Sequence, residues 1–212
     1  MIDSNILHYS ALEPLNVSRE TFQDLEEFRS LIIEKNKNIN LIGENTIKNS
    51  RERHIIDSAQ VIDFIDKNEK HCMDIGSGSG LPGIVLAIIA KHRKLPMRFS
   101  LYEKSFRKAE FLNSVISKFK LNVKVFQKDI FKEKNLETDL IIARAFKPMP
   151  IILKLANYQF SKFKSLILFL GRSDKNLIKE SLIDWTFEYK EKKSITSSES
   201  KIVKIWNLKK NV

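Results

Sequence analysis

The sequence is poor in the features that stabilise secreted proteins or anchor proteins in membranes. Its 212 residues include one cysteine, Cys72, so no disulfide can form within the chain. It has no uninterrupted apolar run of about eighteen residues, and its first ten residues lack the basic and apolar regions of a signal peptide. We therefore expect a soluble, cytoplasmic protein with no membrane partner. Cys72 lies in an apolar run, which favours a buried structural thiol over a catalytic one.

Glycine is also scarce, and its distribution is uneven. The chain has six glycines, four of which fall within residues 76–83. Four glycines in eight residues exceed what a simple turn requires, so this segment is the first candidate for a functional site.

Negative charge is the minority sign. Lys and Arg total 37 against 26 Asp and Glu, which gives a net charge of +11. Such an excess attracts polyanions, and nucleic acid is the obvious candidate. A genome biased toward A and T would also raise the lysine content without functional meaning, so charge alone leaves both explanations open.

The first 66 residues have a helical pattern. Ser18 is a suitable N-cap, and apolar residues recur every three or four positions after it, which predicts an amphipathic helix over residues 18–37. A second helix is predicted to begin near Thr46, with Ile47, Ile55, Ser58, Ile62 and Ile65 on one face. The N-L-I-G segment at residues 40–43 is predicted to be the turn between the two helices.

After residue 70, short β-rich runs alternate with helical ones. Strands are predicted at residues 72–75, 99–102, 123–126, 140–143 and 166–170, and helices at 82–92, 106–119 and 150–160. This alternation is typical of a parallel sheet. Residues 185–189 and 202–208 are predicted to add an antiparallel hairpin, joined by the serine-rich loop 194–200. We expect an α/β protein with a seven-stranded, mainly parallel sheet, in which a helical extension (1–66) and a sheet domain (67–212) form one compact unit.

The glycine-rich segment D-I-G-S-G-S-G-L-P-G, residues 74–83, follows an apolar strand and opens a helix. Glycine allows the chain to turn sharply and lets backbone amides approach a ligand closely, and Pro82 suits the first turn of a helix. The segment is therefore predicted to bind a nucleotide-like cofactor.

A dinucleotide is one candidate for that cofactor. Gly78, Gly80 and Gly83 satisfy the pattern G-x-G-x-x-G, and Glu103 follows Gly83 by twenty residues. A dinucleotide enzyme has its ribose-binding acid at that spacing. On this interpretation the protein is a nicotinamide-dependent dehydrogenase.

S-adenosylmethionine is the candidate that we favour. Asp74 lies at the end of the first strand, where a negative charge suits an ammonium and a sulfonium better than a pyrophosphate. Gly76 follows that strand directly. Glu103 is then expected to accept hydrogen bonds from the ribose hydroxyls, and Asp129 with Ile130 to hold the adenine. An ordinary strand-end acid and a core aliphatic residue are the alternative for the last pair.

Five collinear segments resemble the bacterial RsmG family, also called GidB. They are N-I-N-L before Gly43, R-E-R-H-I-I-D-S at 51–58, D-I-G-S-G-S-G-L-P-G-I at 74–84, K-S-F-R-K-A-E-F-L at 104–112 and A-R-A-F at 143–146. The R-H-x-x-D-S and R-A-F segments are more specific than the glycine loop. The resemblance implies a Rossmann-like class I methyltransferase fold. It also implies transfer of a methyl group from S-adenosylmethionine to N7 of a guanosine in small-subunit (16S) ribosomal RNA.

The resemblance further implies that Gly76, Leu81, Asp129 with Ile130, and Arg144 contact or border the cofactor. Arg144 would position the substrate by donating to guanine O6 or to a phosphate. The alternative for Arg144 is an ordinary salt bridge at a strand end. Guanine N7 carries a lone pair and no proton, so no general base is expected.

Six residues are candidates for binding RNA: Arg53, His54, Lys104, Arg107, Lys108 and Arg172. Family members commonly carry Lys-Gly after the fifth strand, where this chain has Leu170 and Gly171. Either Arg172 supplies the displaced charge or the contact is absent. The alternative for His54 is a packing role. Asp57 is expected either to orient His54 or to cap the structure. A solvated helix start is the alternative for the residues at 104–108, and no metal site is expected because no other ligand has suitable spacing to His54.

The combined prediction is a monomeric RNA guanine-N7 methyltransferase that acts on 16S ribosomal RNA or on a 30S assembly particle. A methyltransferase acting on another RNA, a small molecule or a protein is the first alternative. A non-catalytic RNA-binding protein of ribosome assembly is the second.

Overall fold

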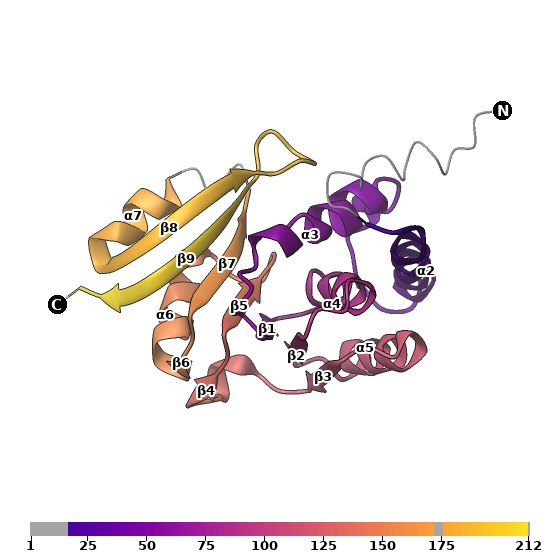
Figure 1. The fold of residues 1–212 in the computed structure, drawn as a ribbon, viewed down its shortest axis with the longest axis horizontal. Coiled ribbons are helices and arrows are strands. Elements are labelled where there is room, and N and C mark those ends of the chain that lie inside the picture. The colour runs from indigo at the N-terminus through magenta and orange to yellow at the C-terminus, as the bar shows by residue number, and fades with distance from the viewer. Residues whose placement is uncertain (1–16, 172–175, 212) are drawn as a thin grey trace.

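The centre of the protein is a seven-stranded sheet. The computed structural model describes residues 17–171 and 176–211, and its main sheet has the order β3-β2-β1-β5-β7-β9-β8 (Figure 1). The strands are β1 His71–Ile75, β2 Arg98–Tyr102, β3 Val123–Phe126, β5 Leu140–Ala143, β7 Ser165–Leu170, β8 Trp185–Lys193 and β9 Lys201–Lys210. Neighbours from β3 to β7 pair in parallel, whereas β9 is antiparallel to both β7 and β8. The predicted mainly parallel sheet with a C-terminal hairpin is therefore confirmed.

Helices cover both faces of this sheet. They are α4 Gly83–His92 and α5 Phe106–Phe119 on one face, and α6 Met149–Gln159 and α7 Leu177–Asp184 on the other. Successive side chains of a strand point to opposite faces. In β5, Leu140 and Ile142 accordingly pack with α4 and α5, while Ile141 and Ala143 pack with α6. Burial on both faces explains why this strand is a continuous apolar run.

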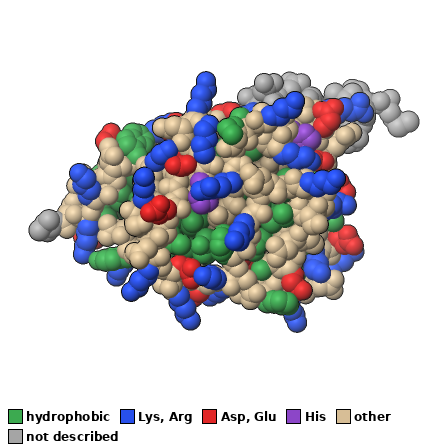
Figure 2. Space-filling view, turned by 60° about the horizontal axis from the view of Figure 1, so that its bottom comes forward, with side chains coloured by type: hydrophobic (Ala, Val, Ile, Leu, Met, Phe, Trp, Pro, Cys, Tyr) green, Lys and Arg blue, Asp and Glu red, His purple; other side chains and the backbone are tan. Residues whose placement is uncertain are grey.

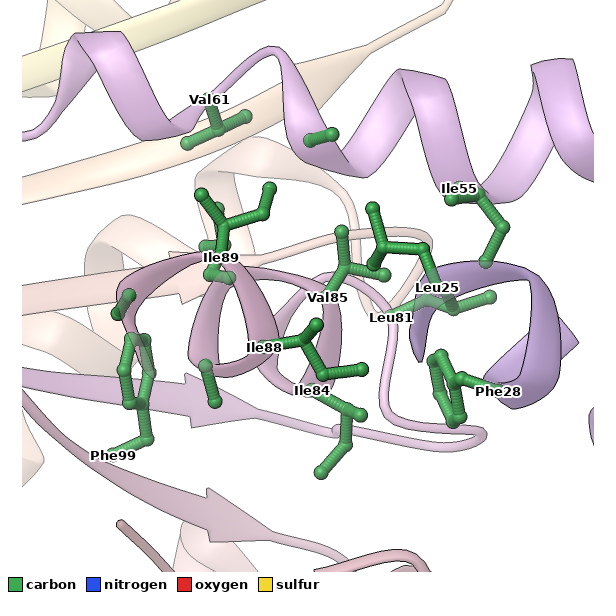
Figure 3. Close-up of a cluster of buried hydrophobic side chains, with 14 of the residues drawn as sticks. Leu25, Phe28, Ile55, Val61, Leu81, Ile84, Val85, Ile88, Ile89 and Phe99 are labelled. Carbon is green, nitrogen blue, oxygen red and sulfur yellow. The ribbon is translucent and has the colours of Figure 1, made fainter. Parts of the chain in front are cut away.

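Helix α4 connects the sheet to the N-terminal helices. Every residue from Gly83 to Ala90 is buried, as expected for a helix that is hydrophobic all round. Helix α2, Arg19–Asn36, packs against it, and the side chains of Leu25 and Phe28 reach toward α4 (Figure 3). The N-terminal segment and the sheet thus share one core, while the division of the chain at residue 66 stays a prediction.

The second N-terminal helix differs from its prediction. Ser18 caps α2 as expected and accepts a bond from the amide of Thr21 at 3.3 Å. The following segment, however, is broken into the 3₁₀ turn η2 Glu44–Thr46, the π-helical turn η3 Arg51–Ile56, the short helix α3 Asp57–Ala59 and the 3₁₀ turn η4 Ile62–Phe64. The predicted inner face survives, because Ile55, Ser58 and Ile62 are buried. A π-helical turn inside a helix is frequent at functional sites.

Helix α7 and two smaller features were not predicted from the sequence. Strands β4 Leu136–Glu137 and β6 Phe160–Lys162 form a separate parallel pair, and the 3₁₀ turn η5 spans Ile130–Lys132. These two smaller features are too short for a periodic pattern to show. Within residues 17–171 and 176–211, no helix is both long and apolar enough to cross a membrane.

One buried cation lies beneath the hairpin. Lys204 of β9 has a side chain only 2% exposed, and its Nζ lies 2.7 Å from Glu69 and 2.8 Å from Asp66. Glu69 is equally buried and also accepts a bond from the hydroxyl of Ser165. This ion pair joins the segment before β1 to the antiparallel side of the sheet.

Candidate functional site

A cavity of about 550 Å³ lies where the parallel strands end. It extends over the segments that follow β1, β2, β3 and β5, and the strand order of the sheet reverses between β1 and β5. Open α/β sheets bind their ligands at such a switch point, and the volume is in the usual range for small-molecule sites. The N-terminal loop with Leu41, Ile42 and Gly43 closes one side, so the N-terminal segment and the sheet both line this cavity. We call it the donor cavity, because S-adenosylmethionine is the predicted ligand.

The glycine loop depends on backbone angles that other residues rarely adopt. Gly76, Gly78 and Gly80 all have positive φ, at 71°, 56° and 89°. A side chain at Gly76 would overlap the ring of Phe146, whereas one at Gly78 would meet no atom nearer than 3.8 Å. Gly78 lines the cavity, so a ligand can approach the backbone closely at this point.

Asp74 holds the glycine loop in place through hydrogen bonds to both of its ends. Its carboxylate is buried and accepts a hydrogen bond from the amide of Gly83 at 2.9 Å, while its carbonyl accepts one from the hydroxyl of Ser77. Burial raises the pKa of Asp74 to about 7, although the bond from Gly83 opposes the shift. Among the predicted cofactor-binding residues, Asp74 and Gly80 do not line the cavity. Asp74 therefore acts on the shape of the loop, which it joins to the start of α4.

Glu103 faces the cavity in a fixed orientation. One carboxylate oxygen accepts a bond from the amide of Gly78 at 2.9 Å, and the other accepts one from the amide of Ser105 at 2.7 Å. The side chain is largely buried, yet it lines the cavity. An ionised carboxylate has about four acceptor positions, so Glu103 retains capacity for two hydroxyl donors. This is the arrangement expected of a group that binds a ribose.

An apolar slot adjoins this carboxylate. Asp129 caps the turn η5 by accepting a bond from the amide of Phe131 at 3.1 Å, and Ile130 is buried beside it. Tyr102 stacks on Phe126 with ring centroids 4.8 Å apart, and Tyr102 also lines the cavity. A flat heterocycle fits between such walls. Together the carboxylate, the slot and the open glycine loop suit an adenosine with a charged tail, so the residues present fit S-adenosylmethionine.

Arg144 lies at the edge of the same cavity and is held by three groups. Its Nε is 3.1 Å from Oδ2 of Asp57, its Nη2 donates to the carbonyl of Arg53, and its guanidinium lies 5.7 Å from the ring of Phe169. Within the described residues, no hydrogen bond is made by Nη1. Arg144 therefore combines the predicted strand-end salt bridge with one nitrogen left for a ligand.

His54 lies beside this guanidinium and also lines the cavity. Its Nδ1 is 3.4 Å from Nη2 of Arg144, and its Nε2 is 2.8 Å from the hydroxyl of Thr46. Burial, together with the charges of Arg144 and Arg53, lowers the pKa of His54 to about 4. His54 is therefore neutral near pH 7.

Asp57 connects the site to the C-terminal hairpin. While one oxygen pairs with Arg144, the other accepts bonds from the hydroxyls of Ser194 at 3.0 Å and Thr196 at 2.9 Å, and from the side-chain amide of Gln60 at 2.9 Å. The expectation that Asp57 orients His54 is not what the structure shows, because no hydrogen bond joins these two side chains in the described part of the chain. The serine-rich loop, for which no role was predicted, is thus hydrogen-bonded to the residue that holds Arg144.

Only some of the predicted RNA-binding residues line the cavity in the described part of the chain. Lys104 and Lys108 stand at the rim of the cavity, whereas Arg53 and Arg107 are exposed outside its lining. Arg172 lies outside the described residues. On the face shown in Figure 2, Lys and Arg side chains are spread over the whole surface with Asp and Glu among them, and hydrophobic side chains gather near the middle. The positive charge is not confined to one patch of this face.

Several lining residues were not identified from the sequence: Tyr102, Lys128, Phe131, Phe146 and Lys147. Each ends a strand on the cavity side of the sheet or lies in the short segment after one. That position is the signal that would have indicated them, since side chains at the carboxyl ends of parallel strands gather at one edge.

Comparison with known proteins assigns the family. The family model of GidB, described as rRNA small subunit methyltransferase G, matches residues 21–206. A protein of Pelagibacter ubique named Ribosomal RNA small subunit methyltransferase G is 44% identical over 96% of this chain and 96% of its own length. One of the same name from Rickettsia africae is 36% identical over 93% of this chain and 100% of its own.

Solved structures agree at the level of the fold. A structure of a SAM-dependent methyltransferase from Aquifex aeolicus superposes with a TM-score of 0.55 at 14% identity, covering 77% of this chain and 98% of the other. The open α/β sheet with a terminal antiparallel hairpin is thus the fold of S-adenosylmethionine-dependent methyltransferases. With the match along nearly its whole length, the chain belongs to the GidB family, the rRNA small subunit methyltransferases G.

Proposed function

We propose that this protein transfers a methyl group from S-adenosylmethionine to N7 of a guanosine in small-subunit (16S) ribosomal RNA. The observation that carries the proposal is the carboxylate of Glu103, fixed between the glycine loop and an apolar slot in a cavity at the switch point of the sheet. Membership of the GidB family supports ribosomal RNA as the substrate. The cytoplasm, where ribosomes are assembled, is the proposed location.

The chemistry requires alignment more than proton transfer. When bound, S-adenosylmethionine supplies an electrophilic methyl group, and the lone pair of the acceptor forms the new bond while the electrons of the carbon–sulfur bond remain on sulfur. Glu103 orients the ribose, and the amide of Gly78 holds Glu103 in place. Arg144 presents Nη1 at the edge of the cavity, where it binds guanine O6 or a phosphate.

Among the described residues at the cavity, neither His54 nor Glu103 is suited to act as a general base, and this favours N7 as the acceptor. An exocyclic amine or a hydroxyl must lose a proton on methylation, whereas guanine N7 has none to lose. His54, with a pKa near 4, is a weak base at neutral pH. Glu103 is engaged by two backbone amides, and Asp74 is buried outside the cavity lining.

The rim of the cavity supplies charge for RNA. Lys104, Lys108, Lys128 and Lys147 all line it. Contacts of lysine with phosphate release counterions, so RNA binding should weaken steeply as the salt concentration rises. A small-molecule substrate would show little such dependence.

The decisive experiment combines the purified protein, labelled S-adenosylmethionine and 30S subunits from a strain that lacks the gene. The expected result is one methyl group per subunit, mapped by mass spectrometry to 7-methylguanosine in 16S ribosomal RNA. Incorporation at another atom would refute the N7 assignment. Binding of the cofactor without any incorporation would instead indicate a non-catalytic assembly protein.

Calorimetry tests the cofactor site separately. Glu103→Gln should weaken binding of S-adenosylmethionine about tenfold or more, because a carboxylate accepts stronger hydrogen bonds than an amide. Glu110→Gln, at an exposed position of α5, is the matched control. Equal affinities of the two variants would contradict the assignment of Glu103.

A further inference from the structure

His54 lies between two parts of the donor cavity that are far apart in the sequence. One ring nitrogen contacts Thr46, which is bonded to the cavity wall at Gly43, and the other contacts Arg144, 90 positions further along the chain. We propose that His54 is a positioning residue for methyl transfer, which holds the wall through Nε2 and orients Arg144 through Nδ1. This inference rests on the proposed function.

The hydroxyl of Thr46 determines which ring nitrogen carries the hydrogen. This hydroxyl has a single hydrogen, and its oxygen lies 2.6 Å from the carbonyl of Gly43, a group that can only accept. With its hydrogen donated there, the hydroxyl accepts from Nε2 of His54 at 2.8 Å. Burial lowers the pKa of His54 to about 4, so the ring is neutral near pH 7. A hydrogen on Nε2 therefore leaves Nδ1 with its lone pair.

The surroundings of Nδ1 lead to the same tautomer independently. In the described part of the chain, its hydrogen-bonding contact is Nη2 of Arg144 at 3.4 Å, and a guanidinium nitrogen donates but does not accept. A hydrogen on Nδ1 would set two donors against each other, whereas its lone pair accepts from Nη2. Because the distance is long for a hydrogen bond, the contact orients the guanidinium together with Asp57 and the carbonyl of Arg53. Nη1 is then the nitrogen left for a ligand among the described residues.

The wall that Thr46 secures belongs to the donor cavity. Residues 41–43 line it, and Asn36 fixes the start of this segment by accepting bonds from two of its backbone amides at 2.7 and 2.9 Å. Thr46 holds the other end, since both its amide and its hydroxyl donate to the carbonyl of Gly43. His54, through Thr46, therefore restrains the end of the wall opposite Asn36.

Asparagine and glutamine separate the two roles of the ring. His54→Asn places an amide oxygen near the position of Nδ1, so it retains an acceptor for Arg144 and loses the bond to Thr46. His54→Gln places an amide nitrogen near the position of Nε2, so it retains the bond to Thr46 and loses the acceptor for Arg144. Thr46→Val removes the hydroxyl on the side of the wall alone. His92→Gln, at the end of α4 and outside the lining of the cavity, is the matched control.

Two quantities are measured for each variant, after thermal unfolding has verified its folding. Calorimetry gives the Kd for S-adenosylmethionine, and kcat/KM is measured on unmodified 30S subunits at saturating cofactor. His54→Asn and Thr46→Val should raise the Kd about three- to tenfold, as expected for one lost hydrogen bond, with kcat/KM within about twofold of the wild-type value. His54→Gln should lower kcat/KM about tenfold or more through displacement of Arg144, with the Kd within about twofold. The control should match the wild-type protein in both quantities.

Parallel losses in the two His54 variants would show a purely structural role and overturn the inference, as would wild-type values in both. The side-chain ¹⁵N NMR spectrum at pH 7 is the second test, in which the signals missing from His54→Gln identify His54. The hydrogen is expected on Nε2, and a hydrogen on Nδ1 would overturn the inference. If the wild-type protein methylates no 30S subunit, the proposed function fails, while the tautomer and the cofactor affinities still decide whether His54 holds the wall.

Discussion

Asp57→Ala is expected to weaken both the fold and the activity, because Asp57 holds Arg144 in the site. The Asp57 and Arg144 side chains are only 14% and 16% exposed, with 3.1 Å between Oδ2 and Nε. Truncation leaves a largely buried guanidinium with the carbonyl of Arg53 as its remaining hydrogen-bond acceptor among the described residues, apart from the contact with His54.

The size of the effect follows from burial and from the number of bonds lost. Removing one partner of a buried ion pair costs about 3–5 kcal/mol, and the remaining bond to Arg53 places this case near the lower limit. A loss of about 3 kcal/mol corresponds to a fall in Tm of roughly 6–12 °C for a chain of this size. Displacement of Nη1 should also lower kcat/KM for RNA by about tenfold or more.

A double-mutant cycle isolates the pair from the other bonds of Asp57. Urea unfolding is measured for Asp57→Ala, Arg144→Ala and the combined variant. Because the double variant contains no unpaired charge, its loss of stability should be smaller than the sum of the single losses by about 1.5–3 kcal/mol. Ser194→Ala, which removes a hairpin bond and keeps the ion pair, is the control and should lose about 1 kcal/mol. Losses that add to within about 0.5 kcal/mol would refute the reasoning.

Three further predictions concern buried ionisable groups. Lys204→Met should lower the free energy of unfolding by about 3–5 kcal/mol, because it leaves the carboxylate of Glu69 buried without its cation; a loss below about 1 kcal/mol in urea would contradict this. The pKa of Asp74 is raised from 3.8 to about 7 in the folded protein, so folding favours the protonated carboxyl. The free energy of unfolding should therefore be highest below pH 4 and fall by roughly 4 kcal/mol as the pH rises to 7. The Asp74→Asn variant should lack that decline. If the free energy of unfolding of the variant and of the wild-type protein changed equally with pH, the prediction would be contradicted. The imidazole of His54, with a pKa near 4, should show no titration by NMR between pH 6 and 8, whereas a midpoint near 6.5 would show it to be solvated.

The elements that the sequence predicted best are those whose pattern is set locally. Strands β3 and β5 begin and end at the predicted residues, Val123–Phe126 and Leu140–Ala143. The prediction of a continuous second helix was wrong, because that segment consists of short turns, one π-helical and two 3₁₀, and one short α-helix. The carbonyl of Arg53 within that turn accepts a bond from Arg144, 91 positions away in the sequence. Contacts of that range leave no trace in local periodicity.

The candidate site was predictable where one segment contains its chemistry. The glycine loop and Glu103 could be identified from the sequence because strand, turn and acid follow in a fixed order. The pairing of Asp57 with Arg144 spans 87 positions, and its bond to Ser194 spans 137. Only the folded sheet brings these together, so the sequence could indicate Arg144 but not the residues that hold it.

The order of strands in the sheet has a consequence for biosynthesis. Strand β9 lies between β7 and β8, although it follows both in the sequence. While the nascent chain lacks β9, the apolar strand Ser165–Leu170 has an open edge of backbone amides and carbonyls, and such edges pair readily with other chains. Aggregation during translation should therefore be greatest after β7 has emerged from the ribosome, and chaperones that shield exposed strands would act in that interval.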